Sequence, residues 1–267
     1  MSNKKAVDAL VLREVPVGDS DKLLTVLTAE YGKLYVTAKG ARSAKSKVMA
    51  LCRIFTYANI EFYEKGDRRW LSGGSVNDSF FGINSDLAGF SLASYILQIA
   101  DEITGEGVEA HDVLRMTLNS LYCIEKKVKP LWQIKAVYEL FAVTVSGMEP
   151  DLSACAVCKT TEASGYWLDV MNGRIICEDC MRRASGNAPL AQTDQYNTRN
   201  ILIPMDRSSI ASAAYVIFAD PQRIFSFSLK EGDSRENFCR AAEVYLINHL
   251  ERSFDALDFY KSLKEDI

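Results

Sequence analysis

The sequence predicts an α+β multidomain protein that contains a small β-barrel, an α-helical domain and an inserted four-cysteine, zinc-ribbon-like module. Three observations support this fold class. The first 80 residues contain five strand-like segments without a helix pattern between them. The apolar period then changes from two to between three and four, and two Cys-x2-Cys pairs interrupt the helical part.

The five predicted strands are separated by turns rich in Gly, Asp, Ser and Lys. They are Val7–Leu12, Lys22–Thr28, Lys33–Ala38, Ile54–Tyr63 and Arg68–Val76. Short strands at this spacing are typical of a small barrel or sandwich. We therefore assign residues 1–80 to a β domain.

The helical pattern begins after Ser85, which we expect to be the N-cap of the first helix. The clearest later helix has Pro130 at its first position, apolar residues at spacings of three and four, and Gly147 as its stop. Helix patterning resumes from Ser208, after a loop-like stretch from Gln192 to Asn200. These boundaries predict helical segments at 81–150 and 188–267, with the cysteine module at 151–187 between them.

Composition and charge exclude several classes of protein. With 48% hydrophobic and 25% charged residues, the chain is neither collagen-like nor wholly disordered. Its longest uncharged stretch, Leu87–Ala100, is shorter than the ~18 to 20 residues of a membrane-spanning helix. Asp8 and Arg13 break the apolar run that a signal peptide needs. We therefore expect a cytoplasmic protein without a membrane segment.

The cysteine spacing predicts a metal site. Cys155 and Cys158 are separated by two residues, as are Cys177 and Cys180, and 18 residues connect the pairs. The connection contains strand-like segments at 165–170 and 174–176 around a turn, so it can fold back as a hairpin. The pattern favours one structural Zn²⁺ bound by four thiolates, without an open position for water or substrate.

Two other interpretations of the four cysteines are weaker. A pair of disulfides is uncommon in a reducing compartment, and a redox Cys-x-x-Cys motif normally occurs in a thioredoxin-like βαβ context that is missing here. Lys159, Arg174, Arg182 and Arg183 lie near the pairs. They either offset the negative charge of the thiolates or contact phosphate.

A concentrated positive segment follows the third predicted strand. Residues 1–80 hold 13 Lys and Arg against 9 Asp and Glu, whereas the other residues hold 18 against 26. No acidic residue occurs between Lys39 and Ile60, a stretch that contains five cations: Lys39, Arg42, Lys45, Lys47 and Arg53. Such a segment is either a solvated loop or a phosphate-binding surface of sequence-independent affinity.

Aromatic side chains accompany these cations. Strand alternation places Ile54, Ala58, Ile60 and Phe62 in the barrel core and leaves the alternate residues on the outer face. The predicted outer residues are Lys33, Tyr35, Phe55, Tyr57 and Tyr63. Exposed rings beside cations are typical of OB-type barrels that stack unpaired bases, although the same rings could pack against the helical domain.

Several segments resemble the RecO family of bacterial recombination mediators. The run from Glu30 to Lys47 is similar to the hallmark segment of that family, and 18–21, 146–152 and 250–254 resemble its early turn, the entry to its cysteine module and its closing helix. The resemblance spans most of the chain. It is most specific in the first 50 residues and in the Cys-x2-Cys pairs.

This resemblance implies a non-catalytic protein of DNA repair, DNA damage response and recombination that is associated with the nucleoid. It implies an OB-fold nucleic-acid-binding domain at 1–80, DNA contacts by the basic-segment residues, and Zn²⁺ on the four cysteines. Together with the residues of the predicted outer face, the candidate DNA-binding residues are Lys33, Tyr35, Lys39, Arg42, Lys45, Lys47, Arg53, Phe55 and Tyr57. Family members bind single- and double-stranded DNA, anneal strands and, with RecR, help to load RecA onto DNA coated by single-stranded-DNA-binding protein. No short motif marks a site for the acidic tail of that coating protein.

Catalysis and RNA binding are the competing hypotheses. The sequence contains no Walker A loop, nucleophile elbow or zincin motif. The two histidines, His111 and His249, lie in helical patterns typical of surface or packing residues. The stronger rival is an RNA- or transcription-associated binding protein, because OB barrels and zinc ribbons occur there too.

Overall fold

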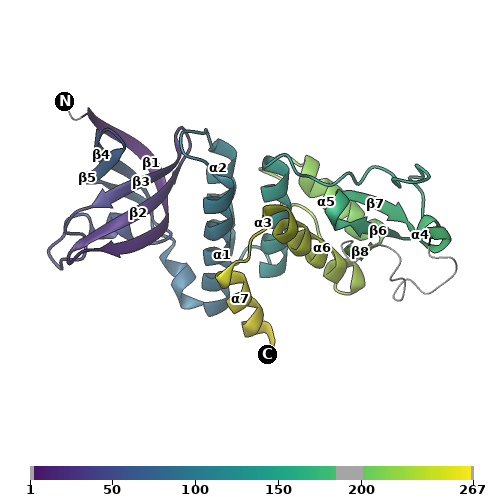
Figure 1. Cartoon of the computed structure of the whole chain (residues 1–267). Helices are drawn as coiled ribbons and strands as arrows, with labels where there is room; N and C mark the ends of the chain where they lie inside the picture. The colour runs from purple at the N-terminus through teal and green to yellow at the C-terminus, as the bar shows by residue number, and fades with distance from the viewer. Residues whose placement is uncertain (1–2, 185–200, 266–267) are drawn as a thin grey trace. The chain divides into compact units, whose positions relative to one another are not determined.

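The computed structural model describes residues 3–184 and 201–265, which form two compact units (Figure 1). The first unit contains residues up to Leu131 together with those from Phe254 onward, and the second contains Trp132–Ser253. The predicted loop at 192–200 lies outside the described residues. None of the described helices is both long and apolar enough to cross a membrane.

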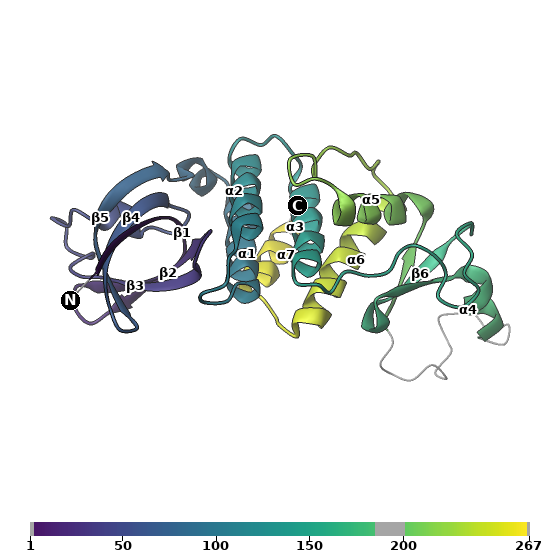
Figure 2. The ribbon, with the colours of Figure 1, turned by 90° about the horizontal axis from the view of Figure 1, so that it is seen from above.

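The first unit begins with a closed five-stranded barrel, in the strand order β1-β2-β3-β5-β4 (Figure 2). Antiparallel pairs join all neighbours except β3 and β5, which meet in parallel at Thr37 and Trp70. The predicted α+β class with an OB-like barrel is confirmed. The strands are β1 (Asn3–Val17), β2 (Asp21–Thr28), β3 (Gly32–Ala38), β4 (Tyr57–Lys65) and β5 (Arg68–Asp78).

Three α-helices and two short 3-10 helices complete this unit. Asp86, rather than the predicted Ser85, caps the first α-helix, because its carboxylate accepts the N–H of Ala88 while Ser85 donates to the carbonyl of Gly82. The elements are η1 (Met49–Cys52), η2 (Phe81–Ser85), α1 (Leu87–Ile103), α2 (His111–Glu125) and α7 (Asp255–Glu265).

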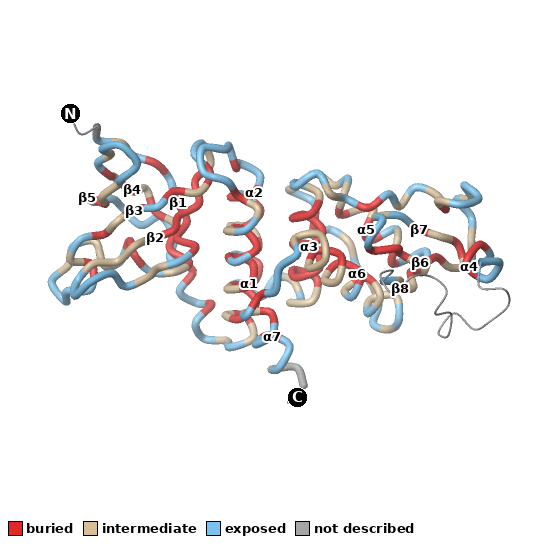
Figure 3. The backbone as a smooth tube through the Cα atoms, in the orientation of Figure 1, coloured by how far each residue is buried: buried red, intermediate tan, exposed pale blue. Residues whose placement is uncertain are grey.

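The barrel has apolar residues on both faces of β1 and β2. Its interior contains Leu24 and Val26, whereas Leu27 points to the other face and is also fully buried. Helix α1 packs on β1 and α2 packs on β2. Figure 3 shows the resulting buried residues along these strands. The helices therefore cover part of the outer barrel face, and that part is closed to a large ligand.

The predicted fourth strand begins too early in the sequence. Residues 53–56 follow η1 as a turn, and Phe55 adopts a left-handed backbone with φ +68°. Phe55 donates its N–H to Val11 O, and Val11 donates its own N–H to Thr56 O. These two hydrogen bonds hold the turn against β1, so strand alternation starts only at Tyr57.

The described part of the second unit joins four α-helices to a three-stranded sheet. Helix α3 confirms the helix predicted between Pro130 and Gly147. The sheet confirms the predicted hairpin and adds a strand that the sequence did not reveal, which follows residue 200 and pairs with β6. The elements are α3 (Leu131–Val145), β6 (Tyr166–Asp169), η3 (Val170–Asn172), β7 (Arg174–Cys177), α4 (Glu178–Ala184), β8 (Leu202–Met205), α5 (Arg207–Phe218) and α6 (Asp233–Leu250).

Two contacts attach the hairpin and helices of this unit to one another. Gly173 turns the hairpin with φ +58°, and a Cβ there would lie 2.6 Å from the Tyr245 hydroxyl oxygen of α6. Only glycine satisfies both constraints. The buried Lys135 ammonium lies 2.7 Å from a carboxylate oxygen of Glu139 and 2.7 Å from one of Glu243, so charge pairing ties α3 to α6.

Candidate metal centre and nucleic-acid interface

The structure brings the four predicted cysteines together in the second unit. Their sulfur atoms all lie within 4.8 Å of one another, and Cys158 Sγ lies 3.6 Å from Cys177 Sγ. Four sulfurs bound at about 2.3 Å to a tetrahedral ion lie about 3.8 Å apart, whereas a disulfide needs a separation of about 2.05 Å. The arrangement therefore fits one metal ion and does not fit disulfides.

Backbone hydrogen bonds shape the first cysteine pair into a tight turn. The N–H of Lys159 donates to Cys155 O, and the N–H of Cys155 donates to Thr160 O, both at 2.9 Å. Lys159 itself is left-handed with φ +61°. The second pair lies where β7 ends and α4 begins, and Cys177 N–H donates to Cys155 Sγ at 3.2 Å. Residues distant in sequence thereby converge at the sulfur cluster.

These hydrogen bonds also affect the acidity of the thiols. Burial opposes ionisation of Cys155, but backbone N–H donors of Cys158, Cys177 and Val157 outweigh it and lower the pKa to about 6. Burial raises the pKa of Cys177 and of Cys180. A thiolate is the metal-binding form of cysteine, so metal binding displaces the protons that burial retains on Cys177 and Cys180.

Three arginines of the cysteine module have partners within it. Arg174 Nε lies 3.5 Å from Asp169 Oδ2, and Arg182 forms an ion pair with Asp179 at 2.9 Å. Arg183 donates to the sulfur of Cys180 at 3.3 Å. These contacts favour charge compensation over phosphate binding for the cations of this module.

The predicted basic segment forms a loop at residues 39–48, which is attached to the turn between β1 and β2. Gly40 donates its N–H to Asp21 Oδ1 at 2.8 Å, and Arg42 donates its N–H to Ser20 O at 2.9 Å. The Arg42 guanidinium also donates to the carbonyls of Gly18 and Asp19. The loop therefore has a defined base at one end of the barrel.

The cations of this basic loop, together with Arg53, are exposed. Lys39 lies over the Trp70 ring at 5.9 Å. Lys45, Lys47 and Arg53 form no ion pair with any residue in the described part of the chain. Their charges are thus available to an anionic partner.

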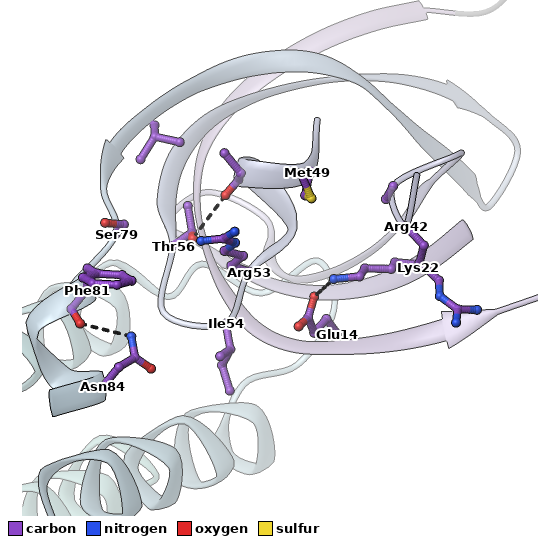
Figure 4. Close-up of a pocket in the computed structure, with 13 residues that line it drawn as sticks. Glu14, Lys22, Arg42, Met49, Arg53, Ile54, Thr56, Ser79, Phe81 and Asn84 are labelled. Carbon is purple, nitrogen blue, oxygen red and sulfur yellow. Dashed lines mark hydrogen bonds and ion pairs between the residues drawn. The ribbon is translucent and has the colours of Figure 1, made fainter. Parts of the chain in front are cut away.

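A pocket of about 800 Å³ opens beside the base of the basic loop (Figure 4). The predicted Arg42 and Arg53 line it, whereas the sequence did not identify the other lining residues as functional. Ile54, for example, is predicted in the barrel core but lines the pocket. The adjacent aromatic residues Phe80 and Phe81 ahead of α1 are a sequence feature that could have indicated an exposed ring here. The lining residues are Glu14, Lys22, Ala41, Arg42, Met49, Ala50, Arg53, Ile54, Thr56, Val76, Ser79, Phe81 and Asn84.

The predicted aromatic face is wrong for Phe55. Its ring is 1% exposed and packs edge-on against Phe90 of α1, with ring centroids 5.5 Å apart. The reason is the turn at 53–56, which places this ring under the helix rather than in solvent. Packing against a helix was the alternative that the sequence left open, and it applies here.

Lys33 and Tyr57 also lie apart from the basic loop. Lys33 Nζ forms an ion pair with Asp101 at the end of α1, at 2.8 Å. Tyr57 is half-buried and lines a separate hollow of about 390 Å³ with residues of α2 that include His111. Burial, followed by the charges of Asp8 and Glu30, raises the pKa of Tyr57. The same hollow is lined by both Asp112 and Arg115.

Tyr35 is the predicted ring on β3 that remains exposed, at 39%. Tyr63, on β4, is exposed at 42%. Neither ring lines the 800 Å³ pocket. Contact between Tyr35 and a nucleobase therefore stays a prediction, and it would take place outside this pocket.

Comparisons with known proteins agree with this arrangement. The family model described as "Recombination protein O N terminal" matches residues 1–80, and the model described as "Recombination protein O C terminal" matches residues 84–257. The chain belongs to the RecO family. The first match covers the barrel, and the second covers α1 to α6, the start of α7 and the cysteine module.

Curated relatives of similar length carry the name of the same family. A "DNA repair protein RecO" from Acetivibrio thermocellus is 24% identical over 98% of both chains. One from Thermoanaerobacter sp. (strain X514) is 27% identical over 96% of this chain and 97% of its own. Another, from Listeria monocytogenes serovar 1/2a, is 28% identical over 66% of this chain and 68% of its own. All three are named as DNA repair proteins.

Proposed function

We propose that this chain is a non-catalytic, DNA-binding recombination mediator in DNA repair. It binds single- and double-stranded DNA, anneals complementary strands and, with RecR, promotes loading of RecA onto DNA coated by single-stranded-DNA-binding protein. The observation that carries this proposal is the basic loop: exposed lysines that form no ion pair with the described residues lie beside a large pocket in an OB-like barrel.

The charge distribution suits a partner whose sequence does not matter. Lys45 and Lys47 lie on an exposed loop and Arg53 lies at the pocket, so they can follow the phosphates of a flexible strand. Phosphate contacts provide affinity that is independent of base sequence and falls with salt. A protein that anneals any complementary pair requires this kind of binding.

The cysteine cluster supports a structural role for a metal, which we propose to be Zn²⁺. Cys155, Cys158, Cys177 and Cys180 would hold it, and four thiolates leave no position for a reacting water. When bound, the ion supplies a cross-link between the first cysteine turn and the end of the hairpin. The site is consistent with a protein that binds without turnover.

The partners remain part of the proposal. RecR, RecA and the acidic tail of single-stranded-DNA-binding protein follow from the family, as do a cytoplasmic location and association with the nucleoid. The basic loop is electrostatically suited to acidic partners as well as to DNA. The described residues carry no feature that assigns the tail to one surface.

A reconstituted loading reaction tests the function. RecA filament formation is measured on single-stranded DNA coated with its binding protein, with RecR present and with or without this chain. We expect the chain to accelerate loading and to anneal complementary strands, while it neither cleaves DNA nor hydrolyses ATP by itself.

Two results would contradict the proposal. One is cleavage of DNA or hydrolysis of ATP by an activity that co-purifies with the chain. The other is strong preference for RNA over DNA of matched sequence, because that preference favours the RNA- or transcription-associated alternative.

A further inference from the structure

Phe81 is the most exposed phenylalanine of the first unit, with 70% of its surface accessible, and it lines the 800 Å³ pocket. Its ring gains little from folding because it is hardly buried. Figure 4 shows it on the opposite side of the pocket from Glu14, Lys22 and Arg42. An exposed ring on the wall of a charged pocket can stack against a planar aromatic ligand.

The backbone around this ring is held in place on both sides. Phe80 is left-handed with φ +43°, an uncommon conformation for a bulky residue, and it buries its own ring to 4% exposure. The N–H of Gly82 donates to Glu125 of α2 at 2.9 Å, and the Asn84 side chain donates to Phe81 O at 3.1 Å. Phe80 is thus anchored inside while Phe81 is directed outward.

A second wall of the pocket is built in the same way. Phe55 is the other left-handed phenylalanine among the described residues; it is buried, and its neighbour Ile54 lines the pocket. Strained residues that persist beside a pocket are typical of functional sites. The pair of left-handed phenylalanines gives the pocket two anchored walls, one carrying Phe81 and the other carrying Ile54 and Arg53.

The charged residues that line the pocket are mainly cations. Glu14 and Lys22 form an ion pair and offset each other, whereas Arg53 has no such partner in the described residues. Arg42 also lines the pocket at the base of the basic loop. Thr56, Ser79 and Asn84 add polar groups, and a pocket of about 800 Å³ lies within the usual range for small-ligand sites.

We propose that this pocket takes one unstacked base of single-stranded DNA, which stacks on Phe81 while Arg53 contacts the adjoining phosphate. The proposal rests on the DNA-binding function proposed above and adds a structural basis for telling strands apart. In a duplex the bases already stack on one another and do not reach the pocket. The basic loop, in contrast, contacts the phosphates of either form.

The test compares Phe81→Ala with Phe81→Trp and with a matched control, Phe218→Ala. Phe218 lies in the second unit and is 84% exposed. Affinities are measured by fluorescence anisotropy for an oligothymidine strand and for a duplex of the same length. We expect Phe81→Ala to weaken single-strand binding about 5- to 150-fold. Duplex binding changes by less than about twofold, and Phe81→Trp retains single-strand affinity.

A second measurement reports on the base itself. A 2-aminopurine placed in the oligothymidine strand loses fluorescence when it stacks on an aromatic ring. Quenching is expected with the unchanged protein and with Phe81→Trp, and its loss is expected with Phe81→Ala. The melting temperature should be the same for all variants, because the substituted rings are exposed.

The outcomes separate this inference from the function on which it rests. If the unchanged protein binds neither form of DNA, the proposed function fails. If it binds both forms and Phe81→Ala leaves single-strand affinity unchanged or weakens both forms equally, the base pocket is wrong and the function stands. Loss of RecR binding by Phe81→Ala, with single-strand affinity intact, would identify the pocket as a protein-docking site and overturn the inference.

Discussion

The cysteine module and the basic loop contain similar numbers of cations but use them differently. In the module, Arg174, Arg182 and Arg183 each contact an aspartate or a cysteine sulfur nearby. In the loop, Lys45 and Lys47 have no ion-pair partner among the described residues and are exposed. The number of cations in a segment therefore does not identify a phosphate-binding surface. We expect phosphate contacts at the loop rather than at the module, because these loop lysines have no such neighbours among the described residues.

The second contrast concerns how each region is stabilised. The cysteine sheet is small, and its first cysteine turn is joined to the hairpin by a few hydrogen bonds and by the sulfur cluster. The barrel has an apolar interior and a second buried layer under α1 and α2. We therefore expect the module to depend on its metal ion and the barrel to depend on packing.

Removal of one metal ligand should have the largest effect. Cys177→Ser removes a thiolate from a site whose occupation provides about 10 to 16 kcal/mol in small zinc domains. Local structure at 151–184 should be lost, while the barrel still binds DNA. Hydrogen exchange of the two regions, with metal analysis of the purified protein, measures this.

A matched control is Cys123→Ser, which changes a buried cysteine of α2 that lies outside the cluster. This variant should retain one metal ion per chain. A fully folded Cys177→Ser protein without metal would break the comparison, because the module would then be stable through packing alone.

The next largest effect is the loss of stability on removing the Phe55 ring, which is buried against α1. Phe55→Ala should destabilise the first unit by about 3 to 5 kcal/mol, because it deletes a buried aromatic side chain. Tyr35→Ala, on the exposed face of β3, should change stability little. Chemical denaturation of both variants measures the difference. Equal stability of the two would mean that Phe55 is not buried in solution.

The smallest expected effect is on the salt dependence of DNA binding, which should differ between the lysines of the basic loop and the arginines of the cysteine module. Lys45→Gln combined with Lys47→Gln should reduce the slope of log affinity against log salt by about 0.9 for each duplex phosphate contact that is lost. Arg182→Gln combined with Arg183→Gln should leave this slope unchanged, because both arginines have partners in the module. Titrations from low to moderate salt provide the measurement. A larger slope change for the arginine pair would move the DNA site to the cysteine module.

Local sequence patterns were sufficient for the elements whose chemistry is local. Two residues between thiolates, a hairpin with Asn172-Gly173 at its turn and a helix between Pro130 and Gly147 each depend on neighbours along the chain. The five strands are also predictable from the alternation of apolar and polar residues, because successive side chains of a strand point to opposite faces and one face is buried. The cysteine cluster was accordingly predictable down to its four residues.

Whether an individual side chain around the barrel is exposed, buried or ion-paired depends on contacts between segments that are distant in sequence. Phe55 and Tyr57 look like outward-facing strand residues until the hydrogen bonds to Val11 and the packing of α1 and α2 are known. Lys33 looks like a free cation until Asp101 is placed beside it. The sequence by itself determined the barrel, the main helices, the cysteine site and the basic loop. Only the tertiary structure decided which rings and cations remain exposed, because burial and ion pairing depend on residues far apart in the chain.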